Sequence, residues 1–149
     1  MFQTLKIRRF FKSAEKEKII ETIGRAEKCT SGEIRVHVES ITGKDVVLRA
    51  KEVFETMGMT QTELRNGVLI YLAIKDRKFA IIGDRGIDEV VPANFWDKTK
   101  DKMQELFKEG RFADGVCYGI DSAGEHLAKY FPCRADDVNE LPDEISVGK

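Results

Sequence analysis

The chain has 149 residues, and its 25 lysines and arginines nearly balance 26 aspartates and glutamates, which gives a formal net charge of -1. This length suits one domain with a single buried core, and the balanced charge excludes a uniformly basic nucleic-acid-binding surface. No apolar run approaches the roughly 20 residues that a membrane-spanning helix needs, and nothing resembles a signal peptide. We therefore expect a soluble, cytoplasmic protein that does not bind nucleic acid.

The cysteines and the N-terminal segment add two further expectations. Cys29, Cys117 and Cys133 are odd in number and share no metal-ligand spacing, which favours free thiols in a reducing compartment. Residues 1–12 are basic, with apolar side chains between the charges. Such a segment is either a solvated face or a contact with an anionic membrane surface.

Apolar side chains that recur at helical spacing predict four helices. Their ends are indicated by capping residues, proline and glycine, and the expected ranges are 13–29, 45–58, 92–110 and 113–131. Ser13 and Asp45 are candidate N-caps, and Pro92 is expected at the first position of the third helix.

Three strands are predicted, over residues 34–38, 68–74 and 79–82. The first alternates apolar and polar residues, which indicates one face in solvent and places His37 on it. The second is an unbroken apolar run, typical of a strand covered on both faces, and the third completes a hairpin with it. A strand, a helix and a second strand form a βαβ unit, whose right-handed crossover makes the two strands parallel.

These elements predict an α/β fold, a three-layer α/β/α sandwich. Its small mixed sheet, a βαβ unit plus an antiparallel hairpin strand, is flanked by about four helices. The expected domain covers residues 13–131, after the basic segment 1–12 and before an acidic tail, residues 132–149. The tail has no apolar period, so we expect it to be mobile.

Polar residues gather where three of the expected loops meet. The two parallel strands begin at the edge where the antiparallel strand ends, so loops 30–33, 65–67 and 83–89 become neighbours. Together they contribute Glu33, Asn66, Asp84, Asp88 and Glu89. Such oxygen ligands, with glycines that admit backbone carbonyls, are typical of a Ca²⁺ or Mg²⁺ site. They are equally typical of turns, in which Asp84 and Asp88 cap a short helix, and both interpretations stay open.

Four short motifs follow one another at a characteristic spacing. They are Arg65-Asn66-Gly67-Val68-Leu69-Ile70, Asp76-Arg77-Lys78, Gly83-Asp84-Arg85-Gly86-Ile87 and Gly110-Arg111-Phe112-Ala113-Asp114-Gly115. In their order and spacing the chain resembles the TPM domain family, whose α/β module occurs alone or tethered to a membrane. The resemblance covers roughly Ile19 to Tyr130, most of the chain.

This resemblance implies an α/β/α sandwich and a divalent cation held by acidic loop residues. The cation is most often calcium, with magnesium or another divalent cation as alternatives. Carried onto this sequence, the candidate metal ligands are Asp84, Asp88 and Glu33, and the rim of the site is formed by Asn66, Arg65 and Glu89. The family also carries an acid-phosphatase label, from plant thylakoid-lumen members involved in photosystem repair.

Two functional hypotheses follow. The first is a metal-binding interaction module, in which the cation orders residues 84–89 for an unknown protein partner. It is favoured because the sequence shows no general base with a reason to be perturbed. The second is a weak metal-dependent acid phosphatase, in which Arg85 or Arg65 balances phosphoryl charge and Asp88 orients a water molecule. A single calcium ion acidifies its water weakly, so slow turnover is expected from such a site.

Overall fold

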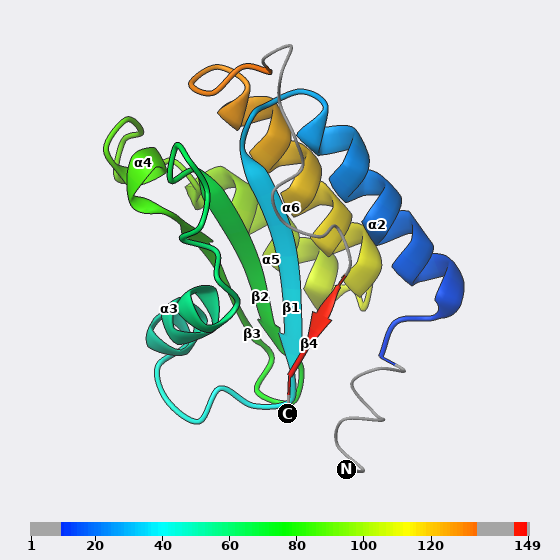
Figure 1. Ribbon diagram of the computed structural model, residues 1–149. Coiled ribbons are helices and arrows are strands. Elements are labelled where there is room, and N and C mark those ends of the chain that lie inside the picture. Colours follow the sequence, from blue (N-terminus) through cyan, green and yellow to red (C-terminus); the bar gives the residue numbers. More distant parts are fainter. Residues whose placement is uncertain (1–9, 134–144, 149) are drawn as a thin grey trace.

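The computed structural model describes residues 10–133 and 145–148, whose helices and strands form three layers (Figure 1). The helices are α2 (Ser13–Glu27), α3 (Val46–Thr56), α4 (Arg85–Asp88), α5 (Asp97–Lys108) and α6 (Phe112–Leu127). The strands are β1 (Glu33–Glu39), β2 (Gly67–Ala73), β3 (Lys78–Gly83) and β4 (Ser146–Val147). Helix α3 covers one face of the sheet, and α2, α5 and α6 cover the other, which confirms the predicted α/β/α sandwich.

The sheet is mixed, with the strand order β3-β2-β1-β4. Strands β1 and β2 are parallel, with Glu33 opposite Gly67, and β3 runs antiparallel to β2, with Gly83 opposite Val68. The predicted βαβ unit and hairpin are therefore both present. Strand β4 was not expected, because the sequence indicated no regular structure in the tail. It pairs parallel to β1, and residues 134–144 of the tail lie outside the described part of the chain.

Strand β2 is buried along its whole length, as its unbroken apolar run predicts. Val68, Ile70 and Leu72 belong to the larger core, against α2 and α6, while Leu69 and Tyr71 belong to the smaller core against α3. Full burial of a large apolar side chain contributes roughly 1.5–3 kcal/mol, so this strand is a main source of stability.

Strand β1 differs from the prediction, because all seven of its residues are buried. His37 is 6 % exposed and Glu39 is 1 % exposed, although the alternating pattern placed them in solvent. The register aligns His37 with Tyr71 on the face of α3. Alternating polar residues are typical of a strand with one face in solvent, but they occur equally where charged side chains are buried in pairs.

Some of the helices begin where the sequence predicts, and others do not. Asp45 caps α3 as predicted, since its Oδ1 accepts the amides of Val47 and Leu48 at 3.0 and 3.1 Å. The predicted cap of α2 was wrong by one residue: Ser13 is the first helical residue and Lys12 is the N-cap. The Lys12 amide donates to Glu15 Oε1 at 2.8 Å, which satisfies the backbone without a serine cap.

Helix α5 begins at Asp97 and not at Pro92. Residues 92–97 form turns instead, in which Phe95 N donates to Pro92 O and Asp97 N donates to Asn94 O. The Phe95 ring packs against α6, with its centroid 5.5 Å from that of His126. Proline therefore opens a turn that anchors an aromatic ring, and the helix starts one turn later.

Two further expectations from the sequence concern the cysteines and the membrane-spanning segments. All three cysteines are free, as predicted. None of the helices in residues 10–133 and 145–148 combines the length and the apolar character that a bilayer crossing requires. The two interpretations of the basic segment, a solvated face or a membrane contact, concern residues 1–12, of which 1–9 lie outside the described range.

Candidate functional site

The three loops that the sequence placed together do meet at one edge of the sheet. Asp84 N donates to Gly67 O at 2.9 Å, and Asn66 Nδ2 donates to Ser31 Oγ at 3.3 Å. Glu33 lies opposite Gly67 at the start of β1. We call residues 64–67 and 83–89 of this edge the Asp84 junction.

Asp84 makes the strongest polar contacts of the junction. Arg65 Nε donates to its Oδ2 at 2.7 Å and Arg65 Nη2 donates to its Oδ1 at 2.8 Å, a bidentate ion pair that also raises the pKa of Arg65. The same Oδ1 accepts the Arg85 amide at 2.8 Å, which makes Asp84 the N-cap of α4. The carboxyl is 5 % exposed, so this geometry confirms the capping interpretation for Asp84.

The backbone of the junction is packed as closely as its side chains. Gly86 N donates to Arg65 O at 2.9 Å. A Cβ at Gly86 would overlap the carbonyl oxygen of Leu64 and lie 2.6 Å from that of Arg65, so only glycine fits. Arg65 itself has φ 51, in the left-handed region that non-glycine residues seldom adopt. The two motifs Arg65-Asn66-Gly67 and Gly83–Ile87 are therefore two halves of one structural unit.

Asp88 lies one helical turn after Asp84, and its carboxyl is exposed. Partial desolvation raises its pKa, the negative charge of Asp84 adds to the rise, and Lys51 opposes it. The two carboxylates therefore lie close enough to repel each other. Such a pair attracts a cation more strongly than either group alone.

Glu33 is not brought into this pair. The strand β2 lies between Glu33 and Asp84, and Gly67 marks the gap between them. A Cβ at Gly67 would meet the backbone oxygen of Met59 at 3.1 Å and its Cε at 3.3 Å, so Met59 fills this space. Within the described ranges, no group of three or more histidine, cysteine, aspartate or glutamate side chains is arranged to hold a metal ion.

The remaining predicted residues frame the junction. Asn66 is 2 % exposed, and its amide donates to Thr62 Oγ1 at 3.3 Å, so it holds the loop in place. Glu89 is the C-cap of α4, where its amide donates to Arg85 O at 3.0 Å. Both Arg85 and Glu89 have exposed side chains.

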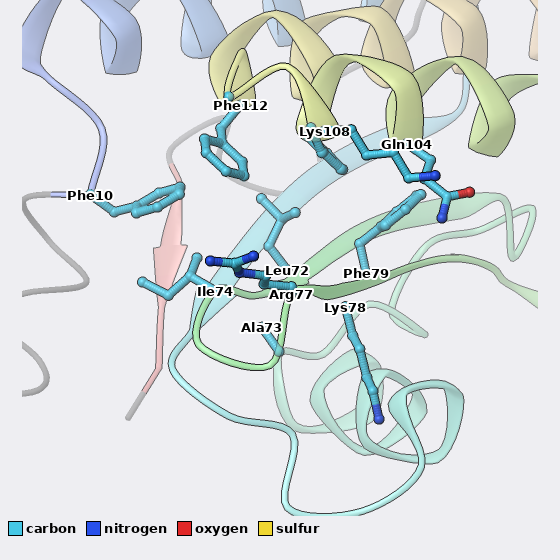
Figure 2. Close-up of a pocket in the computed structure, with 12 residues that line it drawn as sticks. Phe10, Leu72, Ala73, Ile74, Arg77, Lys78, Phe79, Gln104, Lys108 and Phe112 are labelled. Atoms are coloured by element: carbon cyan, nitrogen blue, oxygen red, sulfur yellow. The ribbon is translucent and has the colours of Figure 1, made fainter.

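At the opposite edge of the sheet, the structure contains a pocket of about 510 Å³ that the sequence did not predict (Figure 2). It lies between the turn that joins β2 to β3, the connection from α5 to α6, and Phe10. We call it the hairpin pocket. Its lining comes from segments far apart in the sequence, and the only local signal was the basic dipeptide Arg77-Lys78.

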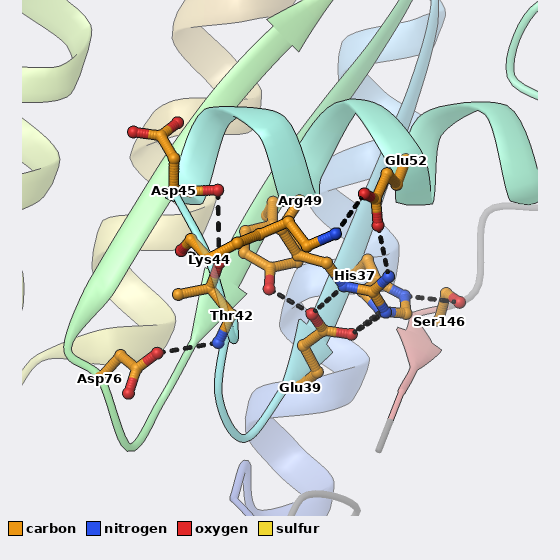
Figure 3. A network of polar contacts seen from close by, with 10 residues as sticks. His37, Glu39, Thr42, Lys44, Asp45, Arg49, Glu52, Asp76 and Ser146 are labelled. Carbon is orange, nitrogen blue, oxygen red and sulfur yellow. Dashed lines mark hydrogen bonds and ion pairs between the residues drawn. The ribbon is translucent and has the colours of Figure 1, made fainter.

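A second unpredicted feature, which we call the Glu39 network, lies on the α3 face (Figure 3). Arg49 Nε and Nη2 donate to the Glu39 carboxylate at 2.7 and 2.9 Å, and the Tyr71 hydroxyl donates to the same group. His37 Nε2 lies 3.2 Å from Glu39 Oε1, and its Nδ1 lies 3.0 Å from Ser146 Oγ. The network therefore joins β1, β2, α3 and β4.

Electrostatics explain why so many polar groups are buried there. Burial alone would raise the pKa of Glu39, but the hydrogen bonds from His37, Arg49 and Tyr71 outweigh it and lower this pKa to about 2. Burial and the adjacent Glu39 carboxylate raise the pKa of Tyr71. Glu39 is therefore a buried anion and Tyr71 a neutral donor to it. Nothing in the alternating sequence of β1 distinguishes such residues from surface ones.

Comparisons with known proteins agree with this architecture. The NMR structure of the BA42 protein from the psychrophilic bacterium Bizionia argentinensis is similar, with a TM-score of 0.90 and 49% sequence identity. The similarity covers 97% of this chain and 99% of that one. Comparison with curated proteins gives no match. A family model described as TPM domain matches residues 7–126. Because this match spans well over half of the chain, the protein belongs to the TPM domain family.

Proposed function

We propose that this protein is a divalent-cation-binding interaction module, with Asp84 and Asp88 as the carboxylates that bind the cation. One observation carries the proposal: Asp84 is the N-cap and Asp88 the last residue of the single-turn helix α4, where the Asp88 amide donates to Asp84 O at 3.2 Å, so the two carboxylates belong to one helical turn. Arg65 pairs with Asp84 and Lys51 acts on Asp88, so a cation that binds the two carboxylates replaces positive charge that is already there. Hard oxygen ligands of this kind suit calcium, and equally magnesium or another divalent cation.

In this proposal the cation and Arg65 compete for the same oxygen atoms. Arg65 occupies both carboxylate oxygens of Asp84, so a cation binds there only as the guanidinium leaves. Two carboxylates supply fewer than the six to eight oxygens that calcium takes, and water or backbone carbonyls complete its shell. The backbone contact between Gly86 N and Arg65 O does not depend on the guanidinium. Replacement of the Arg65 guanidinium by the cation therefore leaves this backbone contact in place and alters the exposed side chains of residues 84–89. In this proposal these side chains form the surface for a protein partner.

Titration with calcium chloride, followed by amide NMR and by the melting temperature, tests the proposal. We expect the amide signals of residues 83–89 to shift and the melting temperature to rise, because a ligand that binds only the folded state stabilises it. Asp84→Asn should abolish both effects, whereas Arg65→Gln should strengthen binding several-fold by removing the competitor. Glu125→Gln, which removes one exposed carboxylate on α6, is the matched control. Absence of both effects in the wild type would refute the proposal.

Weak metal-dependent phosphoester hydrolysis is the second candidate function. It is favoured by the positions of Asp88 and Arg85, whose exposed carboxyl and guanidinium belong to the single turn of α4. The test is turnover of p-nitrophenyl phosphate under matched metal by the wild type, Asp88→Asn and Arg85→Gln. Equal rates in all three would remove these residues from any hydrolytic role.

A further inference from the structure

We propose that the hairpin pocket binds a small amphiphilic anion, an unbranched hydrocarbon chain that ends in one carboxylate. This site is separate from the Asp84 junction. The pocket lies at the carboxyl end of β2, and α/β sheets commonly bind ligands outside the carboxyl ends of their strands. Its volume of about 510 Å³ is within the 300–1,000 Å³ that is typical of small-molecule sites.

The walls of the pocket are apolar. A continuous row of phenylalanine rings forms one wall, with centroids 5.0 Å apart for Phe79 and Phe107, 5.8 Å for Phe107 and Phe112, and 5.2 Å for Phe112 and Phe10. Leu72 and Ile74 contribute aliphatic surface from β2 and the following turn (Figure 2). The lining that the structure describes holds no hydroxyl, imidazole or carboxyl side chain. A ligand body with polar atoms would leave them without partners, so a hydrocarbon fits best.

The rim of the pocket is cationic. Arg77, Lys78 and Lys108 line it, and the described lining contains no aspartate or glutamate. None of the three takes part in an ion pair with another residue of the described ranges. Figure 2 shows the Arg77 guanidinium beside Leu72 and Ile74, while Lys78 extends away toward α3. Arg77 and Lys108 are therefore the two cations placed to meet a ligand.

The chemistry of these two cations selects the head group. A guanidinium presents paired N–H donors that match the two oxygens of a carboxylate, and a lysine adds a point charge. Gln104, the neutral polar side chain of the described lining, supplies a further donor. A ligand that matches this pocket has one anionic group at the rim and one apolar chain between the phenylalanine and aliphatic walls. A fatty acid has both.

Binding of decanoate, kept below its micelle concentration, tests this proposal by calorimetry and amide NMR. Decanol and decyltrimethylammonium are the neutral and cationic controls of the same chain length. We expect amide shifts confined to Phe10 and to residues 72–79 and 104–112. Decanoate should bind about tenfold more tightly than decanol, about 1.4 kcal/mol, because its carboxylate pairs with the two rim cations, and the cationic control should not bind. Equal affinity for decanoate and decanol would overturn the proposal.

Matched variants separate the roles of rim and walls. The double variant Arg77→Gln/Lys108→Gln should weaken decanoate binding about tenfold while decanol binding stays within about twofold. Lys98→Gln removes a charge from the same helix as Lys108, outside the pocket lining, and should change neither ligand. Ile74→Trp fills the pocket and should weaken both ligands.

Two further outcomes decide against the site. The rim variant removes two positive charges and Lys98→Gln removes one. If Lys98→Gln lowers the free energy of decanoate binding by half as much as the rim variant or more, net charge explains the effect and the rim site is excluded. Binding to phosphatidylglycerol vesicles without binding to monomeric decanoate would make the surface a membrane contact instead. Asp84→Asn should leave decanoate binding unchanged, so failure of the cation site and failure of this pocket are distinguishable.

Discussion

The Asp84 junction and the hairpin pocket lie at opposite edges of one sheet, and they differ in whether their charged side chains form ion pairs. At the junction, Asp84 is bound by Arg65 and by the N-terminus of α4. At the pocket, Arg77 and Lys108 border an apolar hollow whose described lining carries no acidic side chain. Removal of one partner of a buried ion pair leaves the other charge without compensation, whereas a cation that forms no ion pair with the described residues is available to a ligand. Binding at the junction must therefore displace an existing contact, and binding at the pocket need not.

Alanine substitutions at Gly86 and Gly110 should give the largest difference in unfolding free energy between the two edges. An alanine Cβ at Gly86 would overlap the Leu64 carbonyl oxygen, so Gly86→Ala should lower the free energy of unfolding by about 3 kcal/mol. Gly110 lines the pocket at φ +78, where a Cβ meets nothing within 4 Å. Gly110→Ala should therefore cost only the backbone strain, about 1 kcal/mol. Urea unfolding measures both variants, and equal losses would contradict the close packing of the junction.

The Glu39 network should give the second largest effect, a dependence of the unfolding free energy on pH. The folded-state pKa of Glu39 is about 2, below its ordinary value of 4.5, so the stabilisation is complete above pH 4.5 and is lost as pH falls toward 2. The difference corresponds to roughly 3 kcal/mol. We expect the advantage of the wild type over Glu39→Gln in unfolding free energy to shrink across this window. An advantage that does not vary with pH would show that the carboxylate charge is not what stabilises the network.

Removal of one charge at each edge gives the third comparison. Asp84→Asn weakens the contacts to Arg65 and to the α4 N-terminus, and should lower the free energy of unfolding by about 2 kcal/mol. Lys108→Gln removes a cation that has no ion-pair partner among the described residues, and should leave stability within about 0.5 kcal/mol. Thermal unfolding in low salt measures both. A larger loss in Lys108→Gln would mean that the pocket rim is structural.

Ser146→Ala should have a smaller effect on stability than Asp84→Asn. The variant removes the hydroxyl beside His37 Nδ1 and should cost about 1 kcal/mol. Hydrogen exchange of the Gly148 amide, which donates to Val38 O at 2.8 Å, should become faster as β4 loosens. Ser13→Ala, in the first turn of α2, is the control and should not accelerate this exchange. Unchanged protection of Gly148 in Ser146→Ala would show that β4 is held by its backbone pairing alone.

Sequence reasoning succeeded where one local signal is enough. The unbroken apolar run of β2 indicated burial on both faces, and Asp45 indicated the start of α3. The strand-helix-strand order gave the parallel pair, and from it the meeting of the loops around Asp84. Each of these inferences depends on residues close together in the chain or on a general rule of topology.

Sequence reasoning failed where distant residues decide. The alternation in β1 suggested a solvent face, but Arg49, Tyr71 and Ser146 bury its polar side chains in ion pairs and hydrogen bonds. Strand β4 has two residues, too few to show a period. Helix α5 starts after Pro92 because Phe95 packs against α6, a contact that no local pattern reveals.

From the sequence alone follow the layers of this protein, the direction of its first three strands and the gathering of acidic loops at one edge. Only the tertiary structure decided that Asp84 is held by Arg65, that Met59 packs against Gly67 between the positions of Glu33 and Asp84, and that cations border an apolar hollow at the other edge. The physical reason is one of range. Hydrophobic periodicity and capping act over a few residues, whereas the pairing of a charge depends on which segments fold against it.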